Sequence, residues 1–145
     1  MKKILILNGP NLNMLGVREP EIYGHETLRD VEVRCSEKAR ELGFKIDFRQ
    51  SNHEGELVGW IQEARGLYQG IIINAAAYTH TSLAIYDALK MLSVPIIEVH
   101  ISDPKQREEF RRFSYIGLVA AAVVAGKGVQ GYPQAIEKMA ELLSV

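Results

Sequence analysis

Short apolar runs alternate with segments of helical periodicity, and this alternation is the feature that most constrains the fold of the chain. The runs lie at residues 4–7, 44–48, 70–73, 94–99 and 118–125. Because they are continuous, they predict strands buried on both faces, as in a parallel sheet covered by helices. The last run, rich in alanine and valine, would also suit a buried helix.

Four helices are predicted among these runs. The first has Thr27 as N-cap and Asp30 three residues later, a capping box, and Gly43 is placed to end it. The last begins with Pro133 at its first helical position. The predicted apolar faces contain, in chain order, Leu28, Val31, Cys35, Ala39 and Leu42; Leu57, Val58, Ile61 and Ala64; Ala84, Ile85, Ala88, Leu89 and Leu92; and Ile136, Met139, Ala140 and Leu143.

Five βα units in this order predict an α/β fold. At this length we expect a flavodoxin-like doubly wound five-stranded parallel sheet of order 2-1-3-4-5. No internal repeat, linker or low-complexity segment divides the chain, so we expect one domain over residues 1–145.

Composition narrows the class of protein. A net charge of −1 and a pI near 6.4 show no excess of positive charge that would favour binding to nucleic acid or to an anionic membrane. The run at residues 4–7 is too short for a signal peptide, and no run approaches the roughly 20 apolar residues of a membrane span. Cys35 is the only cysteine, so no internal disulfide forms. We expect a cytoplasmic protein.

Polar segments follow the first, third and fourth predicted strands, at residues 8–13, 74–82 and 100–103. In a sheet of this order the ligand crevice lies beyond the carboxyl ends of the strands, where the strand order reverses. Amides, imidazoles and hydroxyls dominate these segments, and Asp103 is their one carboxylate. They favour a neutral or anionic polyol-like ligand over a hard cation.

The connection from Asn8 to Glu26 is far longer than the roughly 2–6 residues of an ordinary βα loop. We interpret it as a functional lid with Gly16 and Gly24 as possible hinges, although a solvated surface loop explains its charges equally well.

Tyr23 in this loop is a candidate base. Its pKa of ~10 has to be lowered for that role, and nearby cations lower it. Arg18 lies in the same loop, and Arg111 or Arg112 follows the fourth strand. Without such partners, Tyr23 is better interpreted as a residue that packs the loop against the rest of the protein.

Two histidines lie in the polar segments. Glu98 and His100 are two residues apart, so both side chains point to one face of the sheet. A carboxylate beside an imidazole orients its tautomer and raises its pKa, which suits a proton donor, although a pair satisfied by local hydrogen bonds is the alternative. His80 lies at a predicted helix start with Asp87 on a similar face, where a histidine is more often a cap or surface residue.

Residues 126–131 match the pattern G-x-G-x-x-G. No strand follows to carry the acidic residue expected ~20 residues later in a dinucleotide site, so we predict a tight turn at the sheet edge. The chain has no nucleophile elbow, P-loop or metal-ligand spacing, and we expect no cofactor.

Segments along the whole chain resemble the type II dehydroquinase family. They are LNGPNLNMLG at 7–16, REPEIYG at 18–24, QSNHEGEL at 50–57, INAAAYTHTS at 73–82, EVHIS at 98–102, REEFR at 107–111 and GVQGY at 128–132.

The resemblance implies a cofactor-free lyase that converts 3-dehydroquinate reversibly to 3-dehydroshikimate in the shikimate or quinate pathway. It implies that Tyr23, aided by Arg18, removes the proton beside the ketone. Asn11 would hold the water that stabilises the enolate. His100, oriented by Glu98, would protonate the departing hydroxyl.

The resemblance also implies binding residues and an assembly. Family members form trimers built into dodecamers, and Asp87 would reach from a neighbouring subunit to His80. The groups that would hold the carboxylate and hydroxyls of the substrate are Asn74, His80, Ile101, Ser102 and Arg111. Two residues depart from the family pattern: Ala76 stands where glycine is frequent, and Asp103 where asparagine is common.

Two alternatives have other functions. A flavodoxin-like flavin carrier shares the predicted topology, but residues 8–13 lack the hydroxyls of a phosphate loop. A non-catalytic binding module would keep the fold without turnover.

Overall fold

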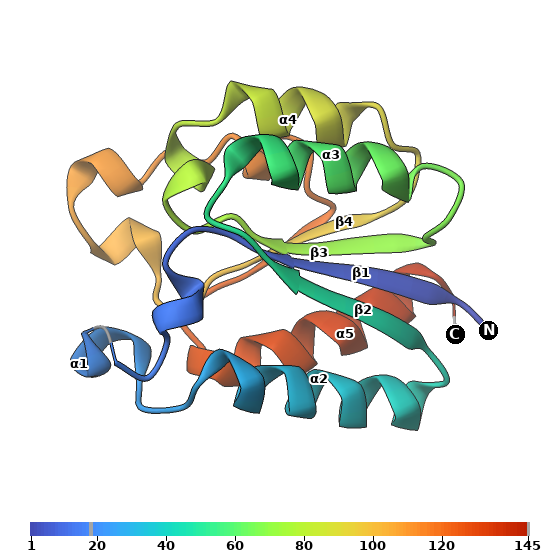
Figure 1. Ribbon diagram of the computed structural model, residues 1–145, viewed down its shortest axis with the longest axis horizontal. Coiled ribbons are helices and arrows are strands. Elements are labelled where there is room, and N and C mark those ends of the chain that lie inside the picture. The colour runs from blue at the N-terminus through green and yellow to red at the C-terminus, as the bar shows by residue number, and fades with distance from the viewer. Residues whose placement is uncertain (18, 145) are drawn as a thin grey trace.

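The computed structural model describes residues 1–17 and 19–144, apart from the side chain of Tyr23. It contains a five-stranded parallel sheet of order β2-β1-β3-β4-β5 (Figure 1), which confirms the predicted flavodoxin-like topology. The strands are β1 (Lys3–Asn8), β2 (Lys45–Gln50), β3 (Gly70–Asn74), β4 (Ile96–Val99) and β5 (Ala122–Val124).

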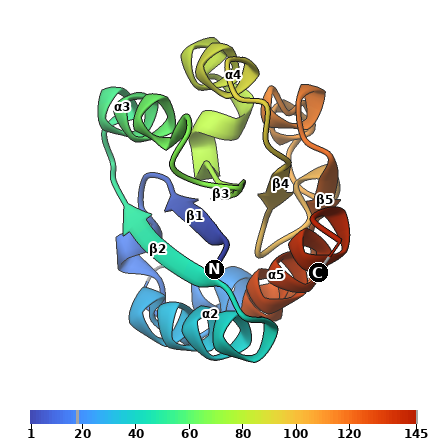
Figure 2. The same cartoon turned by 90° about the vertical axis from the view of Figure 1, so that its right-hand side faces the viewer.

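Helices cover both faces of the sheet (Figures 1 and 2). The helices α2 (Leu28–Leu42) and α5 (Gly131–Leu142) lie on one face. On the other lie α3 (Glu54–Ala64) and α4 (Leu83–Lys90), whereas the short α1 (Pro20–Tyr23) lies beyond the end of the sheet.

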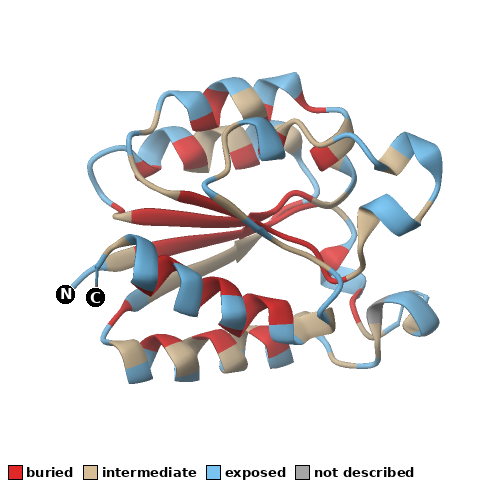
Figure 3. Cartoon of the chain, turned by 180° about the vertical axis from the view of Figure 1, so that it is seen from behind, coloured by how far each residue is buried: buried red, intermediate tan, exposed pale blue. Residues whose placement is uncertain are grey.

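The sheet separates two apolar cores. Along β1, Ile4 and Ile6 pack with residues of α2 and α5, whereas Leu5 and Leu7 pack with residues of α3 and α4. All four side chains are fully buried, and burial of such a side chain stabilises a fold by roughly 1.5–3 kcal/mol. Figure 3 shows buried residues along the strands and on the inner faces of the helices.

The expectation that every strand is buried on both faces is wrong at the two edges. The residues of β2 are mostly half-buried, and Val123 in β5 is 55% exposed. An edge strand has a neighbour on one side only, so the helices cover it incompletely. The run at 118–125 forms a strand only at Ala122–Val124, after a 3-10 helix over Ile116–Leu118.

The predicted boundaries of α2 are confirmed. The Thr27 hydroxyl accepts from Asp30 N at 3.2 Å, and the Asp30 carboxylate accepts from Thr27 N at 3.0 Å. Gly43 ends the helix with a φ of 79°, in the left-handed region that favours glycine. Cys35 lies on the buried face, as predicted.

Two other helix predictions are wrong in detail. Helix α5 begins at Gly131, so Pro133 is its third residue rather than its first. Proline fits there because the N–H groups of the first turn have no acceptor within the helix. Ala84 is exposed on α4 rather than part of its apolar face.

The long connection after β1 is not irregular throughout, because it contains a 3-10 helix over Leu12–Met14 as well as α1. Gly16 has a φ of 92°, and a Cβ there would lie 2.9 Å from the carbonyl oxygen of His25, so this turn requires glycine. Gly24 also has a positive φ, and its hinge role stays a prediction.

The glycines of residues 126–131 form the predicted tight turn between β5 and α5. Gly126 and Gly128 have φ values of 74° and 62°. Their N–H groups donate to the carbonyls of Ser102 and Ile101 at 3.2 and 3.0 Å, which ties this turn to the segment after β4. Across the described residues, no helix is long and apolar enough to cross a membrane.

Candidate active site

A cleft opens beyond the carboxyl ends of β1, β3 and β4, where the sequence predicted a crevice. Loops from all three strands form its walls, with short 3-10 helices after each strand. Arg107, which was not among the predicted site residues, also lines it. The predicted residues that line it are Asn11, Asn74, His80, His100, Ile101, Ser102 and Arg111.

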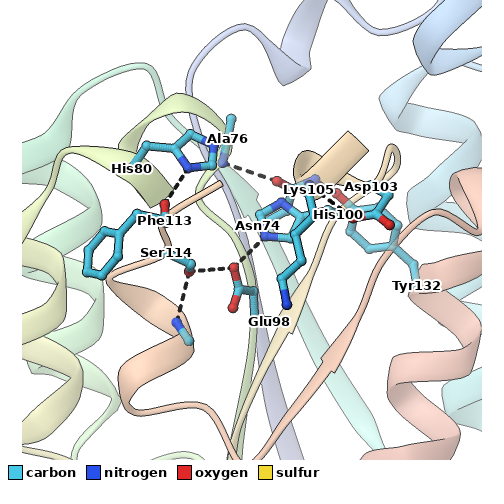
Figure 4. A network of polar contacts seen from close by, with 11 residues as sticks. Asn74, Ala76, His80, Glu98, His100, Asp103, Lys105, Phe113, Ser114 and Tyr132 are labelled. Carbon is cyan, nitrogen blue, oxygen red and sulfur yellow. Dashed lines mark hydrogen bonds and ion pairs between the residues drawn. The ribbon is translucent and has the colours of Figure 1, made fainter. Parts of the chain in front are cut away.

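The predicted pair Glu98 and His100 lies at the end of β4. The imidazole Nε2 of His100 donates to the Glu98 carboxylate, and the two residues are only 7% and 2% exposed. Ser114 Oγ also donates to Glu98, at 2.7 Å, and is held in turn by the N–H of Gly117 at 2.9 Å (Figure 4). Ser114 was not predicted, since nothing in its sequence neighbourhood marks it as a partner of Glu98.

These contacts keep Glu98 charged although it is buried. Burial alone would raise the pKa of the carboxyl, but the hydrogen bond and charge of His100, with the hydrogen bond from Ser114, outweigh burial and lower it. A charged carboxylate accepts hydrogen bonds only, so Glu98 fixes which nitrogen of His100 carries its proton. Nδ1 is the ring nitrogen of His100 that Glu98 does not bind.

His80 lies at the end of a 3-10 helix over Ala76–His80, and not at the start of α4 as predicted; Ser82 is the N-cap of that helix. Its Nδ1 donates to the carbonyl of Phe113 at 2.7 Å (Figure 4). Burial lowers the pKa of His80, the bond to Phe113 opposes this, and the charge of His100 adds to the lowering.

Of the predicted residues with described side chains, Glu98 does not line the cleft but binds His100, and Asp87 lies apart from it. Asp87 is exposed on α4, and the structure does not bring it to His80 within the chain.

The segment after β4 brings two cations to the cleft. Arg107 Nη1 donates to Ser102 Oγ at 3.4 Å, and Arg111 Nε lies 3.1 Å from the Glu108 carboxylate. Asp103 accepts from Lys105 N at 3.0 Å and caps a 3-10 helix over Pro104–Gln106. Asp103 does not line this cleft, but it lines an adjoining pocket together with His80, His100 and Arg111.

Asn11 lines the cleft and is held by residues at the end of β2 and just after it. It has a φ of 71°, and its N–H donates to Asn52 Oδ1 at 2.9 Å. Gln50 Nε2 donates to the same oxygen at 3.1 Å and to the carbonyl of Gly9 at 3.1 Å. Gly9 is required, because a Cβ there would lie 2.4 Å from the carbonyl oxygen of Ala75.

Asn74 lies at the floor of the cleft. Its Oδ1 accepts from Ala76 N at 3.1 Å, and its Nδ2 donates to the hydroxyl of Tyr132 at 3.0 Å (Figure 4). Ala76 has a φ of 52°, a left-handed conformation that is strained for alanine.

Tyr23 is the last residue of α1, a helix that lies at the same end of the sheet as the cleft loops (Figure 1). Its side chain and the whole of Arg18 lie outside the described residues. The predicted contact between them therefore stays a prediction. Over the described part of the chain, no group of three or more His, Cys, Asp or Glu could hold a metal ion.

Comparisons with known proteins agree with one another. Residues 2–140 match the sequence model of the family Dehydroquinase class II. A 3-dehydroquinate dehydratase of Streptomyces avermitilis is 61% identical over 140 residues, which cover 96% of this chain and 88% of the relative. One from Phenylobacterium zucineum is 55% identical and 97% of each chain is covered. The crystal structure of a type II dehydroquinase from Butyrivibrio crossotus is similar with a TM-score of 0.93 at 44% identity, covering 95% of this chain and 97% of that one.

Proposed function

The chain belongs to the class II dehydroquinase family, and we propose that its cleft catalyses the reversible trans-dehydration of 3-dehydroquinate to 3-dehydroshikimate. It is accordingly an enzyme, a hydro-lyase. The observation that carries the proposal is the buried Glu98–His100 pair at the cleft, because loss of a hydroxyl as water needs a positioned acid. The flavin-carrier and binding-module alternatives are not favoured by the comparisons.

Tyr23 is the base in this proposal. It removes the proton from the carbon beside the ketone, and the electron pair moves onto the carbonyl oxygen to give an enolate. Arg18 lies five residues earlier in the same loop. Its positive charge favours the phenolate form of Tyr23 by lowering the pKa of the hydroxyl.

The enolate oxygen needs a hydrogen-bond donor that is already in place when charge develops on it. In the proposal, Asn11 supplies this through a bound water. The placement of Asn11 supports the role, because its N–H is bound by Asn52 Oδ1, which Gln50 binds in turn, and its φ of 71° is uncommon outside glycine. Strained backbone of this kind is frequent at active sites.

His100 completes the reaction by giving a proton to the departing hydroxyl, which leaves as water while the enolate collapses to the conjugated enone. Glu98 is the positioning residue for His100, since it holds the ring and stabilises the protonated form. The burial of both side chains strengthens this interaction relative to one in water.

The substrate carries one carboxylate and several hydroxyls, and the cleft offers groups of matching chemistry. Arg111 supplies a positive charge for the carboxylate, and the neighbouring Arg107 adds a second. The remaining donors and acceptors are Asn74, His80, the backbone of Ile101 and both backbone and hydroxyl of Ser102.

The proposal includes an assembly of trimers into a dodecamer, in which Asp87 of a neighbouring subunit pairs with His80. Large exposed apolar side chains in the segment between β4 and β5 support such an assembly: Phe110 is 71%, Phe113 52% and Leu118 61% exposed. Light scattering tests it, because a particle of 16.3 kDa would contradict any shared site.

We further place the enzyme in the cytoplasm, with a single catalytic domain over residues 1–145 that needs no cofactor. Its pathway would be the shikimate route to aromatic amino acids.

Ultraviolet spectroscopy tests the activity directly, because the conjugated enone of the product absorbs far more strongly than the isolated ketone of the substrate. Native protein should raise the absorbance of a 3-dehydroquinate solution, and His100→Gln should do so roughly 10²–10⁴-fold more slowly. Native protein that produces no absorbance change would refute the proposed activity.

A further inference from the structure

A chain of four hydrogen bonds runs beneath the cleft and connects side chains from β1, β3 and α5. Asn8 Nδ2 donates to the carbonyl of Arg49 at 3.1 Å, and the Tyr132 hydroxyl donates to Asn8 Oδ1 at 2.7 Å. Asn74 Nδ2 donates to the Tyr132 oxygen at 3.0 Å, and Ala76 N donates to Asn74 Oδ1 at 3.1 Å. We call Asn8, Tyr132 and Asn74 the amide relay.

The direction of every bond in the amide relay follows from its two ends. The Arg49 carbonyl can only accept, and the Ala76 N–H can only donate. Both amides are therefore restricted to one orientation, and the Tyr132 proton has to point at Asn8. Burial raises the pKa of Tyr132, against a smaller lowering by the bond from Asn74, so its hydroxyl keeps the proton that it donates.

The relay decides what Asn74 offers to a ligand. Its oxygen is bound by Ala76 N, and one of the two N–H bonds of its nitrogen is directed at Tyr132. The second N–H of the same nitrogen is left for the cleft that Asn74 lines. Asn74 thus presents a donor, which matches a hydroxyl or carboxylate oxygen.

Tyr132 and Asn8 do not themselves reach the ligand. Both are 0% exposed, and neither is among the described residues that line the cleft. Figure 4 shows the Tyr132 ring beside Asn74, on the α5 side of β4. Any effect of Tyr132 on substrate therefore passes through Asn74.

We propose that Tyr132 and Asn8 are positioning residues that hold the Asn74 amide with its N–H toward a substrate oxygen. The identity of that substrate rests on the proposed function, whereas the orientation of Asn74 does not. Without the Tyr132 hydroxyl, Asn74 is fixed only by Ala76 N, and a buried amide nitrogen loses its acceptor.

Steady-state kinetics of Tyr132→Phe test the proposal. We expect KM for 3-dehydroquinate to rise about tenfold, the size of one lost hydrogen bond, with a smaller change in kcat. Tyr68→Phe is the control, because it also removes the hydroxyl of a buried tyrosine, one that bonds to the half-buried Asp47 and Arg49 side chains outside the cleft. An unchanged KM in folded Tyr132→Phe, or an equal rise in Tyr68→Phe, would overturn the proposal.

Proton NMR tests the geometry without any turnover. In native protein the Tyr132 hydroxyl proton should be protected from exchange with solvent and lie close to the Asn8 and Asn74 side-chain amides. The Asn74 side-chain amide resonance should shift in Tyr132→Phe and stay in Tyr68→Phe. Absence of a protected hydroxyl proton in native protein would overturn the relay even if Tyr132→Phe failed to fold. Failure of native protein to turn over 3-dehydroquinate, with the protected proton present, would refute the proposed function alone.

Discussion

The carboxylate of Glu98 accepts a hydrogen bond from Nε2 of His100 at the end of β4, in a place almost closed to solvent. Two residues of one strand that are two positions apart point to the same side of a sheet, so the strand itself brings them together. Ser114 completes the pair from a loop that precedes β5. The arrangement therefore holds His100, the acid of the proposed reaction, in a fixed position at the edge of the protein core.

Replacing Glu98 by glutamine should weaken catalysis more than substrate binding. The neutral amide no longer stabilises a protonated imidazole and can turn its NH2 group toward Ser114. We expect kcat to fall roughly tenfold or more, a part of the about 10²–10⁴-fold that a positioned acid contributes. Steady-state kinetics of Glu98→Gln check this, with circular dichroism to establish folding. A folded variant with native kcat would remove Glu98 from the mechanism.

Glu98 should also make the stability of the protein depend on pH. Its pKa in the folded protein lies below the ordinary value of 4.5, despite burial, because of His100 and Ser114. A lowered folded pKa means that the unfolded chain binds the proton more tightly. The stabilisation is therefore present above pH 4.5 and lost as pH falls through the folded pKa. Urea unfolding across this range should show a steeper loss of stability for native protein than for Glu98→Gln; identical profiles would contradict the lowered pKa.

Ala76→Gly should stabilise the protein. The φ of 52° at Ala76 is strained for alanine at a cost of about 1–2 kcal/mol, and the greater entropy of glycine in the unfolded chain offsets part of the gain. We expect a net increase of about 0.5–1 kcal/mol in the free energy of unfolding, measured by urea titration. Ala77→Gly is the control, because Ala77 is exposed in the same 3-10 helix without a positive φ and should lose stability instead. A loss in both variants would show that Ala76 is not strained.

The Cys35 thiol should be inert in the folded protein. Burial, with a smaller effect of the nearby Glu32 charge, raises its pKa to about 12, so the reactive thiolate is scarce at pH 8. Titration with a chromogenic disulfide reagent should label Cys35 only after addition of denaturant. Rapid labelling of native protein would contradict its place on the buried face of α2.

Much of the fold was predictable because the relevant signals are local. The apolar runs predicted the strands, and five βα units in a chain of this length predicted their flavodoxin-like order. Thr27, Asp30 and Gly43 predicted both ends of α2. The period of two along a strand likewise predicted that Glu98 and His100 share a face. The errors concern features that packing between distant segments determines, namely the burial of the edge strands and the first residue of α5.

The parts of the site that escaped prediction depend on contacts between distant residues. Tyr132 and Asn8 are 124 positions apart, and no periodicity relates a hydroxyl in α5 to an amide at the end of β1. Ser114 reaches Glu98 from a loop whose course follows from packing. Arg107 carried a usable signal, since it stands with Arg111 in the segment after β4 that already supplied candidate cations.

Deuterium exchange of 3-dehydroquinate in D2O, followed by NMR, tests most directly the division of labour between base and acid. Removal of the proton beside the ketone is assigned to Tyr23 and departure of the hydroxyl to His100. His100→Ala should therefore exchange this proton faster than enzyme-free solution while forming little product, and Tyr23→Phe should accelerate neither step. Exchange retained by Tyr23→Phe and lost in His100→Ala would contradict the account.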